Sequence, residues 1–214
     1  MACRAAILIS GSGTNLQAFI DRVAAGALDL DLRLVFSNRP AAFGLERARQ
    51  AGIPTACIEH GEFEDRESFD RAVADVLDEF DPDLIVLAGF MRILSPWFVG
   101  HYEGKILNIH PALLPKYPGL NTHRRVLEAG DKWHGSTVHF VTEELDGGPR
   151  ILQGRLRVCD GETAEQLQHR VQAVEHRIYP EAAGLVASGR AVYRDGEALI
   201  DGQPASDPIV QTFD

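Results

Sequence analysis

Apolar runs that alternate with helical patterns constrain the fold of the N-terminal half more than any other feature of the sequence. Residues 5–9 and 84–87 are uninterrupted apolar runs, as expected of strands that are covered on both faces. Between the strands, apolar residues recur at spacings of three and four, which indicates helices. This alternation predicts an α/β fold with a doubly wound, mainly parallel sheet. The expected strands are 5–9, 32–36, 55–58 and 84–87, and the expected helices are 15–25, 43–51 and 66–80.

The second half of the sequence carries a different pattern. Residues 137–141 and 151–158 alternate as strands do, on either side of a glycine-rich turn. Thr163 and Gln166 resemble a capping box, so a long helix is expected to begin there. Pro180 lies inside the same pattern and is expected to kink or break the helix.

A hairpin is expected near the C-terminus. Residues 191–193 and 198–200 flank the pair Asp195-Gly196, which favours a tight turn between antiparallel strands. No internal repeat, low-complexity tract or linker divides the 214 residues, so a single domain spanning 1–214 is expected. It would subdivide weakly into an N-terminal half of about residues 1–100 and a C-terminal half of about 101–200.

Composition excludes several classes of protein. A net charge of −10 argues against a surface for nucleic acid or for anionic membranes. The apolar run at 5–9 is too short for a signal peptide or a membrane span. Cys3, Cys57 and Cys159 are scattered and form no CxxC pair, which is typical of reduced cytosolic thiols. A cytoplasmic protein is therefore expected.

The run Lys-Ile-Leu-Asn-Ile-His-Pro at 105–111 places two reactive side chains on one strand. Its apolar residues predict a buried strand, and Pro111 ends that strand. Because strand side chains alternate, Asn108 and His110 point to the same face. An amide donor and an imidazole therefore lie at the carboxyl end of a buried strand, where open α/β sheets bind ligands. The alternative is a capping asparagine beside a histidine with ordinary structural hydrogen bonds.

A glycine-rich turn follows the first expected strand. Residues 11–15, Gly-Ser-Gly-Thr-Asn, combine backbone N–H groups with a helix N-terminus, which suits a phosphate. Leu16 replaces the third glycine of a dinucleotide fingerprint, and the second strand ends without an acidic residue for a ribose. No Walker A lysine follows either. The turn predicts a monophosphate site without nicotinamide or ATP, or else an ordinary strand-to-helix turn.

Positive charge gathers around the strand that ends at His110. Between residues 84 and 127 the one acidic residue is Glu103, and such an island would draw anionic small ligands. A solvated surface is the alternative. The proline-rich stretch after His110 is expected to be a long loop beside the site, for example a lid. The cations of this region are Arg92, Lys105, Lys116, Arg124 and Arg125.

Three further side chains are candidates for such a site. Asp146 would fix the tautomer of His110 and favour its protonated form if the fold brings the two together. Otherwise Asp146 is a turn aspartate. Gln172 and Glu175 share a helix face and could hold a substrate amine, although such residues are most often simply exposed. No metal is expected, because the histidines have no cysteine partners at zinc spacing.

Several segments, in order from residue 7 to about residue 183, match one known family. They read ILISGSGTNLQAFI, VFSNRPAAFGLERARQAGIPT, LAGFMRIL, NIHPALLPKYPGLNTHRRVLEAGD, HGSTVHFVTEELDGGPRILQ and VEHRIYPEA. The chain resembles the folate-dependent phosphoribosylglycinamide formyltransferases of purine biosynthesis. The resemblance implies a Rossmann-like formyltransferase fold, phosphoribosylglycinamide and 10-formyltetrahydrofolate as substrates, and no metal. It implies small-molecule partners rather than nucleic acid or membrane, and leaves the oligomeric state open.

The resemblance also assigns site residues by position. It implies a catalytic trio of Asn108, His110 and Asp146. The implied contacts to phosphoribosylglycinamide are Gly13, Thr14, Asn15, Gln172 and Glu175. The implied contacts to the folate are Arg66, Met91, Arg92, Ile93, Leu94, Asn108, Thr142, Glu143, Glu144, Leu145 and Asp146.

The same resemblance implies direct formyl transfer without a covalent enzyme intermediate. Asn108 would donate to the developing oxyanion, and a protonated His110 would donate and later transfer a proton. Formyltetrahydrofolate hydrolases are rivals that use water as acceptor but normally carry an N-terminal regulatory domain. Methionyl-tRNA formyltransferases normally carry a C-terminal RNA-binding domain, and neither extension is expected here. A phosphosugar-binding regulator without catalysis is disfavoured by the intact trio.

Overall fold

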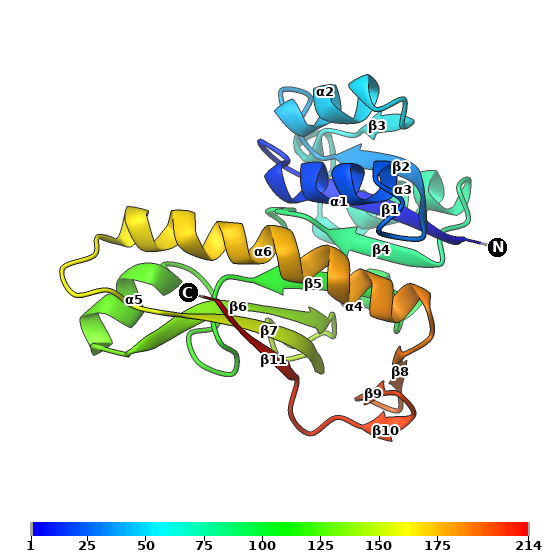
Figure 1. The fold of residues 1–214 in the computed structure, drawn as a ribbon. Helices are drawn as coiled ribbons and strands as arrows, with labels where there is room; N and C mark the ends of the chain where they lie inside the picture. Colours follow the sequence, from blue (N-terminus) through cyan, green and yellow to red (C-terminus); the bar gives the residue numbers. More distant parts are fainter. Residues whose placement is uncertain (1, 214) are drawn as a thin grey trace. The chain divides into compact units, whose positions relative to one another are not determined.

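The computed structural model describes residues 2–213 and divides after Asn108 into two units. In the first unit the strands of the sheet are parallel. The strands are β1 (Cys3–Ile9), β2 (Leu30–Ser37), β3 (Thr55–Cys57), β4 (Leu84–Leu87) and β5 (Ile106–His110), the last of which crosses the boundary. They pair in the order β5-β4-β1-β2-β3, and each pair is parallel (Figure 1). The helices are α1 (Thr14–Ala24), α2 (Phe43–Gln50), the 3-10 turn η1 (His60–Glu62), α3 (Arg66–Asp78) and α4 (Pro96–His101).

The expected α/β fold with a mainly parallel sheet is confirmed. The side chains of β1 from Ala5 to Ile9 are fully buried, as the uninterrupted apolar run predicts. Helix α4 begins with a capped first turn, because the Ser95 hydroxyl accepts a hydrogen bond from the Phe98 N–H at 3.2 Å and Pro96 is the first helical residue.

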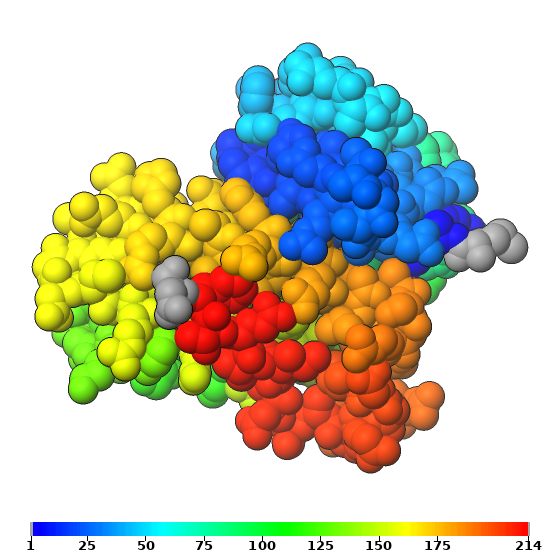
Figure 2. All heavy atoms as spheres, in the orientation of Figure 1, coloured from blue at the N-terminus to red at the C-terminus, as the bar shows by residue number. Residues whose placement is uncertain are grey.

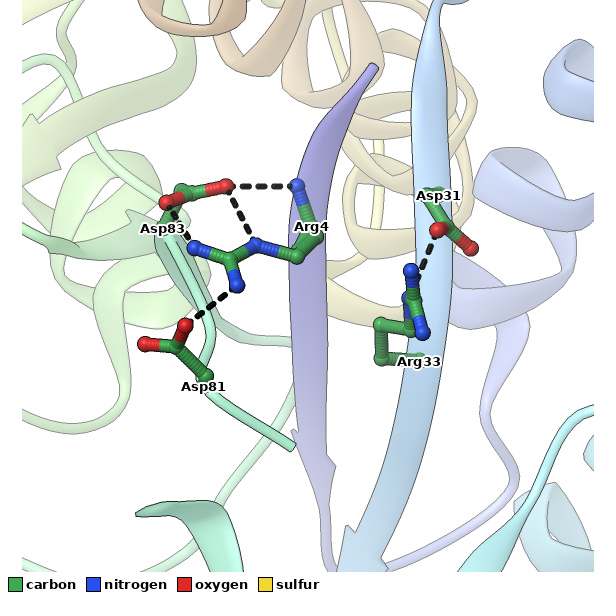
Figure 3. A network of polar contacts seen from close by, with 5 residues as sticks. All are labelled: Arg4, Asp31, Arg33, Asp81 and Asp83. Atoms are coloured by element: carbon green, nitrogen blue, oxygen red, sulfur yellow. Dashed lines mark hydrogen bonds and ion pairs between the residues drawn. The ribbon is translucent and has the colours of Figure 1, made fainter. Parts of the chain in front are cut away.

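An arginine fixes the register of β1 and β4 at their N-terminal ends. Arg4 donates to Asp83 through Nε at 3.0 Å, through Nη2 at 2.8 Å and through its backbone N–H at 3.0 Å (Figure 3). It also pairs with Asp81, and a separate Arg33–Asp31 pair lies on β2. The hydrogen bonds from Arg4 lower the pKa of Asp83 to about 2. Because the strands are parallel, this network lies at the end opposite to their carboxyl ends.

The second unit contains a mixed sheet and a small antiparallel sheet. In the mixed sheet β6 and β7 are antiparallel, and β11 pairs in parallel with β7. The small sheet has the order β10-β9-β8. The elements are α5 (Thr122–Ala129), β6 (Trp133–Phe140), β7 (Arg150–Arg157), α6 (Ala164–Ala187), β8 (Ala191–Arg194), β9 (Glu197–Ile200), β10 (Gln203–Pro204) and β11 (Ile209–Phe213).

Helix α6 packs along β6 and β7 (Figure 1). The predicted capping box of Thr163 and Gln166 is confirmed by reciprocal hydrogen bonds. Pro180 was expected to kink or break the helix, and a break is wrong, because α6 continues through it. Buried residues lie on both sides of Pro180, and their tertiary packing offsets the roughly 3 kcal/mol that an interior proline costs. Gly154 of β7 permits the close approach, since a Cβ there would lie 2.3 Å from Val174.

The C-terminal segment is more ordered than the sequence predicts. The expected hairpin is confirmed, with Asp195 and Gly196 at φ 51° and 84° in the turn between β8 and β9, and β10 adds a third strand. Strand β11 was not expected at all. Figure 2 shows the C-terminal residues, coloured red, at the surface beside the orange atoms of α6. Gln211 of β11 donates to Glu181 of α6 at 2.6 Å.

Among residues 2–213, no helix is both long and apolar enough to cross a membrane.

Candidate active site

Strand β5 carries the two residues that the sequence singled out. The strand ends at His110, and Pro111 follows it, as predicted. Asn108 is half-buried and His110 is buried. The two side chains therefore share one face at the carboxyl end of a parallel strand.

His110 faces an oxygen atom from each of its ring nitrogens. Nε2 lies 2.8 Å from the carbonyl oxygen of Tyr117, and Nδ1 lies 3.3 Å from Oδ2 of Asp146. The same Asp146 oxygen accepts a hydrogen bond from the N–H of Gly119 at 2.8 Å. A neutral imidazole donates from one nitrogen, whereas an imidazolium donates from both. The structure thus places Asp146 beside His110.

Both backbone positions that supply these contacts are strained. Tyr117 has a φ of 57° and Asp146 a φ of 53°, in the left-handed region that non-glycine residues seldom adopt. Such conformations persist only where the surroundings hold them, and they cluster at functional sites. Here the strain aims the Tyr117 carbonyl and the Asp146 carboxylate at one imidazole.

The loop after His110 is held by side chains on its outer side. The Tyr117 hydroxyl and the Lys116 ammonium group both donate to Asp131, at 2.9 and 2.8 Å. The Arg125 guanidinium donates to the Pro118 carbonyl at 2.6 Å and lies over the Tyr117 ring. Lys116 and Arg125, which the sequence grouped as cations of a positive island, therefore help to position this loop.

In the first unit, Gly13 caps helix α1 with a φ of 70°. A Cβ at Gly13 would lie 2.7 Å from the Cα of Gly44, so the loop packs directly against the start of α2. The Arg47 side chain braces it through a 2.8 Å hydrogen bond from Nε to the Ser12 carbonyl. Thr14 and Asn15 begin α1. This geometry leaves a helix N-terminus and its dipole at the predicted phosphate loop.

Two polar residues at the carboxyl ends of β1 and β2 were not among the predicted site residues. The Ser10 hydroxyl donates to Asn38 at 2.6 Å and accepts from the Met91 N–H at 2.8 Å. These bonds join the carboxyl ends of β1 and β2 to the segment after β4. The signal was present, because Ser10 directly follows the expected strand 5–9 and Asn38 lies two residues after the expected strand 32–36.

The segment Met91–Leu94, predicted to contact folate, combines apolar and cationic side chains. Met91 is 67% exposed and Ile93 is 55% exposed. Between them, the Arg92 guanidinium stacks over Phe69 at 4.7 Å. Asp70 accepts a 2.6 Å hydrogen bond from the Ser95 N–H, and burial raises the pKa of its carboxyl group. Exposed apolar groups beside a fixed cation suit an aromatic ligand with negative charge. Arg66, the other predicted cation, is the first residue of α3.

In the second unit, Glu175 and Gln172 lie on α6 and are half-buried. The Ser136 hydroxyl of β6 donates to Glu175 at 2.8 Å. The predicted folate residues Thr142, Glu143, Glu144 and Leu145 form the turn that leads to Asp146, and Leu145 is 57% exposed.

A pair of histidines in the second unit was also not among the predicted site residues. Nδ1 of His123 lies 3.0 Å from Nε2 of His134. Burial, with the nearby charges of His123 and His110, lowers the pKa of His134 to about 3. Burial lowers the pKa of His123 as well. His123 lies in α5, an element the sequence did not predict.

Within the described part of the chain, no group of three His, Cys, Asp or Glu side chains is arranged to hold a metal ion. The predicted residues divide between the units. Gly13, Thr14, Asn15, Arg66 and Met91–Leu94 are in the first, and Asn108 is its last residue. The second contains His110, Thr142–Asp146, Gln172 and Glu175.

The chain is similar to several known proteins. The sequence model of the formyl transferase family matches residues 3–183. The chain is 54% identical over 197 residues to a phosphoribosylglycinamide formyltransferase of Escherichia coli, covering 92% of this chain and 93% of the relative. A solved phosphoribosylglycinamide formyltransferase from Coxiella burnetii has a TM-score of 0.94 and 49% identity, covering 98% of this chain and 99% of that one.

A more distant structure is also similar. A formyltetrahydrofolate deformylase from Pseudomonas syringae has a TM-score of 0.87 and 26% identity, and the match covers 94% of this chain and 66% of that one. The fold is thus shared by enzymes with different acceptors, whereas the higher identities and full coverage are with transferases. The chain belongs to the formyl transferase family and, within it, to the phosphoribosylglycinamide formyltransferases.

Proposed function

We propose that Asn108, His110 and Asp146 carry the chemistry of this enzyme. The chain transfers the formyl group of 10-formyltetrahydrofolate to the amine of phosphoribosylglycinamide, in de novo purine biosynthesis. The products are formylglycinamide ribonucleotide and tetrahydrofolate. The observation that supports the site assignment is the placement of His110 between Asp146 and the Tyr117 carbonyl, two residues from Asn108 on one strand.

The proposed mechanism is direct attack of the amine on the formyl carbon. Negative charge develops on the formyl oxygen, and the Asn108 amide donates to it. His110 donates from Nε2 by exchanging its bond to the Tyr117 carbonyl for one to the substrate, and later transfers the proton to the leaving nitrogen. Asp146 holds the ring through Nδ1, stabilises the imidazolium and accepts, through water, the proton that the attacking amine loses.

The remaining predicted residues bind the two substrates. Gly13, Thr14 and Asn15 offer a helix N-terminus to the phosphate. Glu175, oriented by Ser136, attracts the substrate ammonium group, and Gln172 contacts the same end. The folate lies against the exposed apolar and cationic side chains of Met91–Leu94, with Arg66, Asn108 and the turn Thr142–Asp146 completing its contacts.

Assay of the acceptor tests this proposal against the hydrolase alternative. The purified chain is incubated with 10-formyltetrahydrofolate, with and without phosphoribosylglycinamide. We expect tetrahydrofolate to form only when the amine is present, in equal amount to formylglycinamide ribonucleotide. Release of formate at the same rate without the amine would assign the chain to the hydrolases instead.

We further propose that the protein acts in the cytoplasm and that its two units work as a single formyltransferase domain. Substrates of purine synthesis are small and charged, and the free cysteines Cys3, Cys57 and Cys159 suit a reducing compartment. Fractionation of cells that express the protein tests the location.

A further inference from the structure

The loop after His110 sets the surroundings of that histidine, and the loop itself has a buried anchor at Leu114. The Leu114 N–H donates to the Thr137 hydroxyl at 3.0 Å. Its carbonyl accepts from Gln153 Nε2 at 2.7 Å and from Arg150 Nη1 at 2.9 Å. Leu114 is only 3% exposed. Three residues further on, Tyr117 presents its carbonyl to His110.

Arg150 extends this anchor to the C-terminal segment. Its Nη1 donates to Leu114, and its Nη2 donates to the carbonyl of Ser206 at 3.3 Å. The planar guanidinium presents several fixed donors, so one side chain can bridge two acceptors. Arg150 is also the first residue of β7 and follows the turn that carries Asp146. It therefore adjoins both segments that contact His110, the loop with the Tyr117 carbonyl and the turn with the Asp146 carboxylate.

Ser206 is a firm attachment point because the chain is bonded on both sides of it. On one side the Ala205 N–H donates to the Ala198 carbonyl of β9 at 2.8 Å. On the other side β11 pairs with β7, beginning with Ile209 opposite Leu152. Two strand systems of the second unit thus hold the acceptor that Arg150 reaches.

We propose that Arg150 is a positioning residue for His110, which clamps the Leu114 carbonyl and ties the active-site loop to the C-terminal segment at Ser206. The proposal rests on the catalytic role proposed for His110. Tyr117 has a φ of 57°, and a strained conformation of this kind persists only when its surroundings over-determine it. Loss of the Arg150 bond weakens the hold on Leu114, which Gln153 and Thr137 then retain alone. The loop relaxes, and the Tyr117 carbonyl and Gly119 N–H lose part of their alignment with His110 and Asp146.

This inference gives a role to residues that the family comparison does not cover. The match to the formyl transferase family ends at residue 183, and Ser206 and β11 lie beyond it. Their effect on catalysis is indirect, since they are connected to His110 through Arg150 and the loop and do not contact it.

The test compares Arg150→Met with a matched arginine on the same strand. Arg155 of β7 also bonds the C-terminal segment, through a 3.0 Å hydrogen bond from Nε to the Thr212 hydroxyl, but contributes no hydrogen bond to the loop. Steady-state kinetics with both substrates and the midpoint temperature of unfolding are measured for wild type, Arg150→Met, Arg150→Lys and Arg155→Met.

Arg150→Met is expected to lower kcat about tenfold and to leave both KM values within about twofold, because misplacement affects the transition state more than binding. Arg150→Lys keeps one donor and is expected to lower kcat only about threefold. Arg155→Met is expected to retain the wild-type kcat. If Arg150→Met does not fold, Arg150→Lys carries the test alone.

A wild-type kcat in folded Arg150→Met would overturn the proposal. Where that variant does not fold, a wild-type kcat in Arg150→Lys would do so. An equal loss of kcat in Arg155→Met would also overturn it. His110→Ala, assayed in parallel, separates the two ideas. If His110→Ala is inactive and the Arg150 variants are not impaired, the clamp alone is wrong. If His110→Ala is active, the catalytic assignment on which the clamp rests is wrong.

Discussion

The site proposed around His110 includes three groups that differ in how well the sequence predicts them. Its neighbour Asn108 follows from strand alternation alone. Asp146 is a candidate from the sequence only on the condition that the fold brings it to His110, and the structure places it 3.3 Å from the imidazole. The family resemblance alone assigned it to the site without that condition. The Tyr117 carbonyl could not be predicted, because every residue has a carbonyl and nothing in the sequence shows where a backbone group points.

Asn108→Ala tests the proposed oxyanion donor. Loss of the amide is expected to reduce transition-state stabilisation by about 3–4 kcal/mol, as for other oxyanion donors. The measurement is kcat/KM for the amine substrate, with folate binding followed separately. A variant that binds folate and turns over like wild type would remove Asn108 from the mechanism.

Glu175→Gln isolates the charge of the proposed amine-binding residue. The amide oxygen can still accept the hydrogen bond from Ser136, so the shape of the site is kept while the attraction for the ammonium group is lost. We expect a higher KM for phosphoribosylglycinamide, a lower kcat, or both, with folate binding nearly unchanged. Glu181→Gln, an exposed position on the same helix, is the control. Equal kinetics for the two variants would make Glu175 a surface residue.

The strands and helices were predictable where their pattern is local. Strands β1, β4 and β5 are buried apolar runs, and the capping box of α6 is a local hydrogen-bond motif. Helix α5 was missed because it begins after a left-handed Asn121 without a side-chain cap. Strand β11 was missed because its pairing depends on the distant edge of β7. Packing against residues distant in the sequence also keeps α6 continuous at Pro180.

The phosphate loop depends on the contact between α1 and α2. Gly13→Ala places a Cβ 2.7 Å from the Gly44 Cα in a left-handed backbone, so a loss of stability of about 1–3 kcal/mol is expected. Binding of phosphoribosylglycinamide should weaken more than binding of a folate analogue, measured by titration calorimetry. Gly61→Ala is the control, since its Cβ would meet no atom within 4 Å and Gly61 lies in η1, outside the phosphate loop. Equal weakening of both ligands in a folded variant would take the loop out of the substrate site.

Buried neutral histidines make the stability of the whole molecule depend on pH. Burial lowers the folded-state pKa of His123, His134, His139 and His176, for His134 to about 3. The unfolded chain therefore takes up protons first as the pH falls below the ordinary histidine value of about 6.5. Their contribution to stability is complete above that value and declines as the pH falls through the window toward about 3.

We accordingly expect the midpoint temperature of thermal unfolding to decrease as the pH is lowered from about 7.5 to about 5. His134→Asn removes one titrating group and should make that decline shallower, whatever its effect at neutral pH. Calorimetry across the range is the measurement. An unfolding temperature that is flat over this window would show that the histidines do not stay neutral in the folded protein.

The chain matches transferases over nearly its full length. The proposed mechanism depends most on His110. The most direct measurement is the single-turnover rate of formyl transfer by His110→Ala, with both substrates saturating. General acid catalysis of this kind contributes about 10²–10⁴-fold, so the rate is expected to fall by at least about a hundredfold while both substrates still bind. A folded His110→Ala enzyme that transfers the formyl group at the wild-type rate would contradict the account.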